Sequence, residues 1–206
     1  MLPQEMSAVI LAGGRSSRMG ENKLFLPLGN KPVIGHLIDT LNRVFSECIV
    51  VTDDPASYYS YPVRVTEDLI KCPQKNSLTG IHAGLTFARH QYCMVVAGDM
   101  PFIRESVLTY LCKLSDGYDV TIIREGEHFQ PLCAIYHKNC LPHMEKLLFA
   151  KRYKILDFFP DVRIRYVDAR ELLSLDPELI SFFNVNTPQD YEKALALMAQ
   201  MTKEDV

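Results

Sequence analysis

Short runs of apolar residues alternate along this chain with longer segments in which apolar residues recur every three or four positions. The short runs are typical of buried β-strands, and the longer segments are typical of amphipathic α-helices. Val33, Leu37 and Leu41, for example, lie on one face of a predicted helix that begins after Pro32. The alternation predicts a doubly wound, Rossmann-like α/β fold with a mostly parallel sheet.

The predicted elements cover most of the chain. We expect strands at residues 6–12, 47–52, 62–66, 92–98, 119–124, 131–137 and 162–167. We expect helices at residues 33–45, 78–88, 105–114, 141–149 and 191–198. Two of the strands flank Glu125-Gly126-Glu127, a hairpin-like turn, so the second half is expected to hold a small antiparallel excursion.

Composition and charge narrow the function classes. A chain of 206 residues with 48% hydrophobic content is expected to form one domain, residues 1–206. Its net charge of −3 argues against a nucleic-acid partner, because such proteins need many cations against phosphates. The apolar runs are too short to span a membrane, and the six cysteines include no Cys-x-x-Cys pair. We therefore expect a cytoplasmic protein with reduced thiols and no membrane partner.

The start of the chain carries the strongest chemical signal. An apolar strand ends in Leu11-Ala12-Gly13-Gly14, and the cations Arg15, Arg18 and Lys23 follow closely. Glycines let backbone N–H groups approach a ligand, and arginine and lysine neutralise phosphate oxygens. The spacing matches neither the common phosphate loop nor the dinucleotide glycine fingerprint. The segment therefore indicates a nucleotide site of another kind.

Four segments together carry a resemblance to a known family. They are the glycine loop just described, Ala97-Gly98-Asp99-Met100-Pro101-Phe102, Gln130-Pro131-Leu132-Cys133-Ala134 and Asn184-Val185-Asn186-Thr187-Pro188. This set is similar to the motifs of the molybdenum cofactor guanylyltransferases, a family of nucleotidyltransferases, and the resemblance spans roughly residues 6 to 200. It implies transfer of GMP from GTP to the terminal phosphate of molybdopterin, with magnesium as cofactor. The N-terminal part would bind GTP and magnesium, and the C-terminal part would bind molybdopterin.

The resemblance also implies roles for individual residues. Lys23 would contact the α- and β-phosphates, with Arg15 and Arg18 as further catalytic cations, and the loop residues Leu11 to Gly14 would bind the nucleotide. Asp99 follows an apolar strand and a small glycine, so it is the expected magnesium ligand at the strand's carboxyl end. Asp68 occupies the position of a nucleotide-site aspartate, for which the adjacent Glu67 could substitute, and a solvated charge at the strand end is the alternative interpretation.

The choice of base is open between guanine and cytosine. Leu-Ala-Gly-Gly resembles the guanine-selecting members, because Gly13 permits an approach that an alanine methyl would obstruct. A second family segment, Gly-Pro-Leu-Ala-Gly, appears here as Asn76-Ser77-Leu78-Thr79-Gly80. Contacts to the base could therefore be altered, or could be supplied by side chains.

For the acceptor, the second half supplies the amides Gln130, Asn184 and Asn186 and a basic group at residues 151–154. Amides can read the edges of a pterin, and cations can hold its phosphate. Turn and cap chemistry before Thr187-Pro188 is an equal interpretation of both asparagines, and a solvated helix start is the simpler interpretation of the basic group.

Two alternative functions remain at this stage. One is a cytidylyltransferase for the same cofactor, and the other is an accessory protein that binds nucleotide or cofactor without turnover. Either an enzyme or a carrier would be expected to contact cofactor donor proteins and recipient apoenzymes transiently.

Overall fold

The computed structural model describes residues 1–13, 22–73 and 75–204. Their centre is a seven-stranded sheet with the order β5-β4-β1-β6-β8-β7-β9. Its strands are β1 (Met6–Leu11), β4 (Glu47–Val51), β5 (Arg64–Thr66), β6 (Tyr92–Ala97), β7 (Val120–Glu125), β8 (His128–His137) and β9 (Ile164–Asp168). A small antiparallel sheet is formed by β2 (Pro27–Leu28) and β3 (Lys31–Pro32).

The direction of the strands confirms the predicted fold class. β1 pairs in parallel with β4 and β6, β4 with β5, and β7 with β9. Only β8 runs against its neighbours, β6 and β7. The turn between β7 and β8 contains Gly126 in a left-handed conformation with φ of 58°, which glycine adopts without strain. The hairpin predicted in the second half is therefore confirmed.

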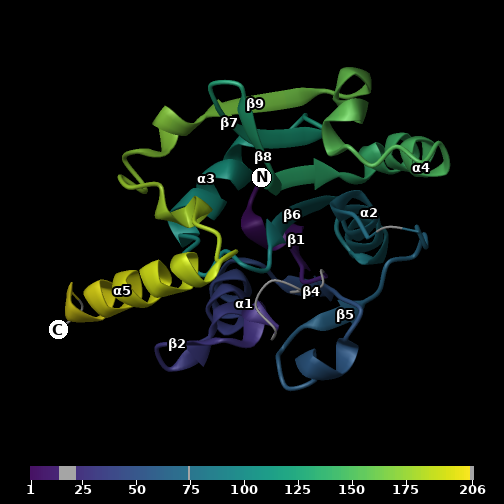
Figure 1. Ribbon diagram of the computed structural model, residues 1–206. Helices are drawn as coiled ribbons and strands as arrows, with labels where there is room; N and C mark the ends of the chain where they lie inside the picture. Colours follow the sequence, from purple (N-terminus) through teal and green to yellow (C-terminus); the bar gives the residue numbers. More distant parts are fainter. Residues whose placement is uncertain (14–21, 74, 205–206) are drawn as a thin grey trace.

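Helices cover both faces of the sheet (Figure 1). They are α1 (Val33–Val44), α2 (Ser77–Phe87), α3 (Glu105–Leu114), α4 (Leu141–Phe149) and α5 (Pro188–Glu204). α1 and α3 enclose one apolar core against the sheet, and α2 and α4 enclose the other. Short 3₁₀ helices join these elements at Pro3–Glu5, Lys23–Phe25, Pro55–Tyr58, Lys138–Cys140, Ile155–Asp161, Ala169–Leu172 and Ile180–Phe182.

The C-terminal helix is longer than its apolar pattern predicts. α5 begins at Pro188, where Thr187 Oγ1 accepts a hydrogen bond from Asp190 N at 3.1 Å. Asp190 Oδ2 in turn accepts from Thr187 N at 2.9 Å, so the two residues form a reciprocal cap. The pattern marks only the buried stripe of this helix, whereas the cap defines where it begins. In Figure 1, α5 projects from the body of the protein beside α1 and β2.

Helix α2 approaches the sheet closely because it presents a glycine to β1. A Cβ atom at Gly84 would lie 2.3 Å from Val9 Cγ1, closer than side-chain atoms pack. The position therefore fixes the distance between α2 and the central strand.

We expect Gly84→Ala to lower the free energy of unfolding by about 1–3 kcal/mol, because the added methyl group overpacks the interface with Val9. Urea unfolding followed by circular dichroism measures this change. In a Val9→Ala background, which removes both Cγ atoms, the same substitution should cost much less. An equal cost in both backgrounds would contradict the proposed contact.

Candidate nucleotide site

The ends of the two central strands bring the glycine loop and Asp99 together. Leu11 pairs with Ala97 in the parallel register of β1 and β6, and Gly98 N donates a hydrogen bond to Leu11 O at 3.0 Å. Gly13 and Asp99 therefore leave the sheet at neighbouring points on its carboxyl edge. This edge is where open α/β sheets bind their ligands.

Lys23 links three distant parts of the chain at this edge. Its Nζ lies 2.6 Å from Asp99 Oδ2 and 2.6 Å from Asn186 Oδ1. The lysine side chain is 20% exposed and the aspartate side chain 14%, so the pair is shielded but reachable. The sequence placed Lys23 and Asp99 in the nucleotide half and Asn186 in the acceptor half, and the structure brings all three into contact.

Backbone contacts hold both ends of this arrangement. Asn22 Oδ1 accepts from Leu24 N at 3.2 Å, which caps the short helix that begins at Lys23. Val185, which is fully buried, donates from its N–H to Asp99 O at 2.9 Å. The C-terminal segment is thereby fixed directly onto the strand end that carries the carboxylate.

A cavity of about 230 Å³ opens beside the Lys23–Asp99 pair. Its lining includes Gly13, Ser77 and Leu132. Within the described part of the chain, Asp99 Oδ1 is buried and has no hydrogen-bond partner. A carboxylate oxygen left in this state can accept a metal ion or a ligand donor. No cluster of three or more His, Cys, Asp or Glu side chains suited to a metal occurs among the described residues.

A second cavity of about 230 Å³ lies next to the first and shares Leu11, Gly13 and Ser77 with it. Asp68 borders this cavity, and its Oδ2 accepts from Thr79 Oγ1 at 3.0 Å. Asp68 Oδ1 is buried without a hydrogen-bond partner among the described residues. Burial raises the pKa of the Asp68 carboxyl above its ordinary value, although the hydrogen bond from Thr79 acts in the opposite direction.

The departure at Asn76-Ser77 serves the start of helix α2. Asn76 Oδ1 accepts from Thr79 N at 3.0 Å, so an asparagine cap begins the helix where the family pattern has a Gly-Pro corner. Ser77 is the first helical residue and borders both cavities. The N-terminus of α2, with its partial positive charge, thus faces the site.

The remaining predicted residues occupy different places. Gly14, Arg15 and Arg18 lie outside the described residues. Gln130 lies on β8 two positions before Leu132, which borders the first cavity, but the pairing of β8 with β7 is irregular between Phe129 and Ala134, and Gln130 does not line that cavity. Asn184 Nδ2 instead donates to Phe182 O at 2.9 Å, a local turn contact.

The basic group at residues 151–154 leads into a 3₁₀ helix and not an α-helix, with Lys154 as the N-cap. It follows α4 and precedes the 3₁₀ helix at Ile155–Asp161, with Lys151 in a left-handed conformation. Arg152 Nη2 forms an ion pair with Asp157 Oδ2 at 2.8 Å. The charge of Arg152 is therefore already paired within the protein.

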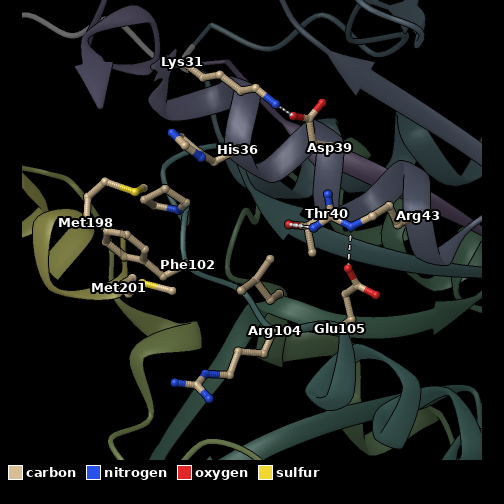
Figure 2. A pocket seen from close by; sticks show the side chains of 12 residues that line it. Lys31, His36, Asp39, Thr40, Arg43, Phe102, Arg104, Glu105, Met198 and Met201 are labelled. Atoms are coloured by element: carbon tan, nitrogen blue, oxygen red, sulfur yellow. Dashed lines mark hydrogen bonds and ion pairs between the residues drawn. The ribbon is translucent and has the colours of Figure 1, made fainter. Parts of the chain in front are cut away.

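Figure 2 shows a cavity of about 550 Å³ outside this site, between α1, the segment after Asp99 and α5. Lys31 pairs there with Asp39 and Arg43 with Glu105, whereas Arg104 pairs with Asp176 outside the lining. It contains neither Lys23 nor Asp68. The candidate site therefore remains the pair of cavities at the carboxyl edge.

Two residues of that site were absent from the sequence-based set. Lys75 borders the second cavity, and Thr79 binds Asp68. Both lie within or beside the segment where the sequence departs from the family pattern. That departure was the available signal, but the turn that carries it has no periodicity from which side-chain directions could be derived.

The family profile and two similar curated relatives belong to one group of nucleotidyltransferases. The profile of the MobA-like NTP transferase domain matches residues 8–162. A probable molybdenum cofactor guanylyltransferase of Pelotomaculum thermopropionicum is 42% identical over 190 residues, covering 92% of each chain. A molybdenum cofactor guanylyltransferase of Desulfosudis oleivorans is 35% identical, covering 93% of this chain and 95% of its own.

A solved structure is similar over almost the same extent. It is the molybdopterin-guanine dinucleotide biosynthesis protein A of Archaeoglobus fulgidus, with 29% identity and a TM-score of 0.81. The match covers 94% of this chain and 99% of that chain. Among the described residues, no helix is long and apolar enough to cross a membrane.

We expect Asp68→Asn to stabilise the free protein by about 0.5–2 kcal/mol at neutral pH, at the expense of function. The folded-state pKa of Asp68 is raised, so burial penalises the charged carboxylate above that pKa, and the penalty disappears below the ordinary value of 3.8. The gain should therefore shrink as the pH falls. Thermal unfolding across this pH range measures it.

Asp39→Asn is the matched control, because Asp39 is 37% exposed, pairs with Lys31 and borders neither of these cavities. That substitution should bring no gain in stability. If Asp68→Asn destabilised the protein at neutral pH, the carboxylate would be a structural group and not a strained binding group.

Proposed function

Since the chain belongs to the family of MobA-like NTP transferases, we propose that it transfers GMP from GTP to the terminal phosphate of molybdopterin. The products are the guanine dinucleotide form of the cofactor and pyrophosphate. The observation that carries this proposal is the contact of Lys23 with both Asp99 and Asn186 at the carboxyl edge of the sheet. One side chain there connects the nucleotide half with the acceptor half.

The proposed reaction is a nucleophilic displacement at the α-phosphorus of GTP, and it needs no covalent enzyme intermediate. An oxygen of the acceptor phosphate attacks the α-phosphorus of GTP and forms the new P–O bond. The bond between the α-phosphorus and the bridging oxygen breaks, and pyrophosphate leaves with the electron pair. Because both reactants are anions, catalysis depends on positioning and on positive charge.

Lys23 is suited to provide that charge. Its ammonium group lies at the strand end, beside the cavity bordered by Gly13 and the start of α2. Asp99 and Asn186 hold the ammonium group in place, so it is preorganised before the substrate binds. Arg15 and Arg18 are proposed to hold the triphosphate from the loop.

Asp99 fits the requirements of a magnesium site shared with substrate. Magnesium in such sites takes one or two carboxylates and completes its shell with phosphates and water. Asp99 offers a buried oxygen without a hydrogen-bond partner in the described part of the chain. When bound there, magnesium would supply positive charge to the triphosphate.

The second cavity is proposed to hold the base. Asp68 borders it and keeps a buried carboxylate oxygen without a described partner, and a carboxylate only accepts hydrogen bonds. Guanine offers donors at N1 and at its 2-amino group. Cytosine bound in the same orientation would place its ring acceptor N3 where guanine has the donor N1–H. Asp68 therefore supports GTP over CTP as the substrate.

The acceptor is proposed to bind on the side of Asn186, with Gln130 at the neighbouring strand end. Asn186 is exposed and touches Lys23, so a bound acceptor would lie beside the proposed catalytic cation. Asn184, which closes a turn with Phe182, would support this segment.

Pyrophosphate release tests the function. Purified protein with magnesium and molybdopterin, with and without molybdate, should release pyrophosphate with GTP and much less with CTP. A preference for CTP would make the protein a cytidylyltransferase. Nucleotide binding without pyrophosphate release would contradict an enzymatic role and favour an accessory carrier.

We expect Lys23→Ala to lower kcat at least about 100-fold while the melting temperature changes little, because its charge acts on the transition state. Steady-state kinetics and thermal unfolding measure the two effects. Lys31→Ala is the matched control, since Lys31 is also an ion-paired lysine but lies outside both cavities. Comparable activity of Lys23→Ala and Lys31→Ala would contradict the role of Lys23.

A further inference from the structure

Lys75 lies across the open face of Gly13. A Cβ atom at Gly13 would be 2.3 Å from Lys75 Cε and 2.4 Å from Lys75 Nζ, so the lysine fills the space that the glycine leaves free. The Lys75 ammonium group forms an ion pair with Asp53. The same lysine borders the second cavity together with Asp68. A nucleotide that approaches Gly13 must therefore meet this side chain.

We propose that Lys75 is a specificity-determining residue that donates a hydrogen bond to O6 of guanine, leaving Asp53 when the nucleotide binds. The inference rests on the proposed function, because it assigns an atom of the base to a side chain of the proposed base cavity. Lys75 and Asp68 then read two neighbouring positions of one base edge.

The hydrogen-bonding capacity of the two side chains supports this assignment. Lysine only donates and an ionised aspartate only accepts. Guanine presents an acceptor, O6, next to a donor, N1–H, which matches the pair. Adenine and cytosine present an amino donor next to a ring-nitrogen acceptor. In the orientation proposed for guanine, either base would place its donor against the ammonium group and its acceptor against the carboxylate, so the pair disfavours both.

The local structure explains why the Lys75 side chain is available to recognise the base. The carbonyl oxygen of the Asn76 side chain caps α2 through Thr79 N, so it is already in use. Lys75 directly precedes that cap and is 32% exposed, which leaves its side chain room to turn. Asp53 is 63% exposed, and an ion pair so open to water costs little to break.

The position of Lys75 also separates it from the proposed phosphate site. Among the described residues, the first cavity is bordered by Lys23 and Asp99 but not by Lys75. The second is bordered by Lys75 and Asp68 but not by Lys23. The two lysines therefore serve different ends of one nucleotide, with Gly13 between them.

Binding of GTP and 6-thio-GTP tests the inference, because the analogue replaces only O6 by the weaker acceptor sulfur. We expect Lys75→Met to weaken GTP binding about 10–100-fold, the effect of losing one charge-assisted hydrogen bond, and to change 6-thio-GTP binding much less. Isothermal titration with magnesium present measures both affinities. Asp53→Asn should tighten GTP binding several-fold, because it removes the competing partner.

Lys71→Met is the matched control. Lys71 has the same charge and also lies near Asp68, but it pairs with Glu67 and does not border the cavity that contains Gly13. This variant should bind both nucleotides nearly as the wild type does. Thermal unfolding of all the variants separates loss of binding from loss of folding.

Two results would overturn the inference. An equal loss of GTP and 6-thio-GTP in Lys75→Met would make Lys75 a general cation for the triphosphate. Unchanged or tighter GTP binding by Lys75→Met would mean that Lys75 only fills the space beside Gly13 and does not contact the base. If the wild type releases pyrophosphate with GTP, either result removes this inference alone. If the wild type releases none, the proposed function fails whatever the binding comparison gives.

Discussion

The hydrogen bond from Gly98 N to Leu11 O is the interaction on which the site depends. It extends the pairing of β1 and β6 to the last residue of each strand, so the glycine loop and Asp99 emerge side by side. A Cβ atom at Gly98 would lie 3.2 Å from Leu11 O and 3.2 Å from Leu24 Cδ1, so any larger residue would displace these neighbours slightly. Close packing of the two strand ends thus sets the geometry of the proposed phosphate site.

The C-terminal segment completes the same site from the other half of the chain. Val185 is buried and donates to Asp99 O, which places Asn186 against Lys23. The cap formed by Thr187 and Asp190 then starts α5 directly behind it. A short series of hydrogen bonds therefore joins the start of α5 to the Lys23 ammonium group.

Two carboxylates, Asp68 and Asp99, each keep one buried oxygen without a partner in the described part of the chain. An unsatisfied buried oxygen lowers stability, and proteins retain such groups where a ligand completes them. Both lie at the carboxyl edge of the sheet, on either side of Gly13. The protein thus has two carboxylate oxygens near the same glycine that can bind a ligand donor or a metal ion. Lys23 lies beside one of these carboxylates and Lys75 lies near the other.

The sequence by itself determined the fold class, because apolar periodicity specifies which faces are buried wherever a strand or helix is regular. It also identified Lys23, Asp99 and Asn186 as candidate site residues, because each stands in a recognisable motif near a strand end or a helix cap. The contact of Lys23 with Asn186, the turn contact of Asn184 and the position of Lys75 over Gly13 were decided only by the tertiary structure. These side chains lie in turns and short helices, where no period fixes a direction. Their contacts join positions far apart in sequence, or lie across a turn, and only the packing of the strands and of α2 brings such positions together.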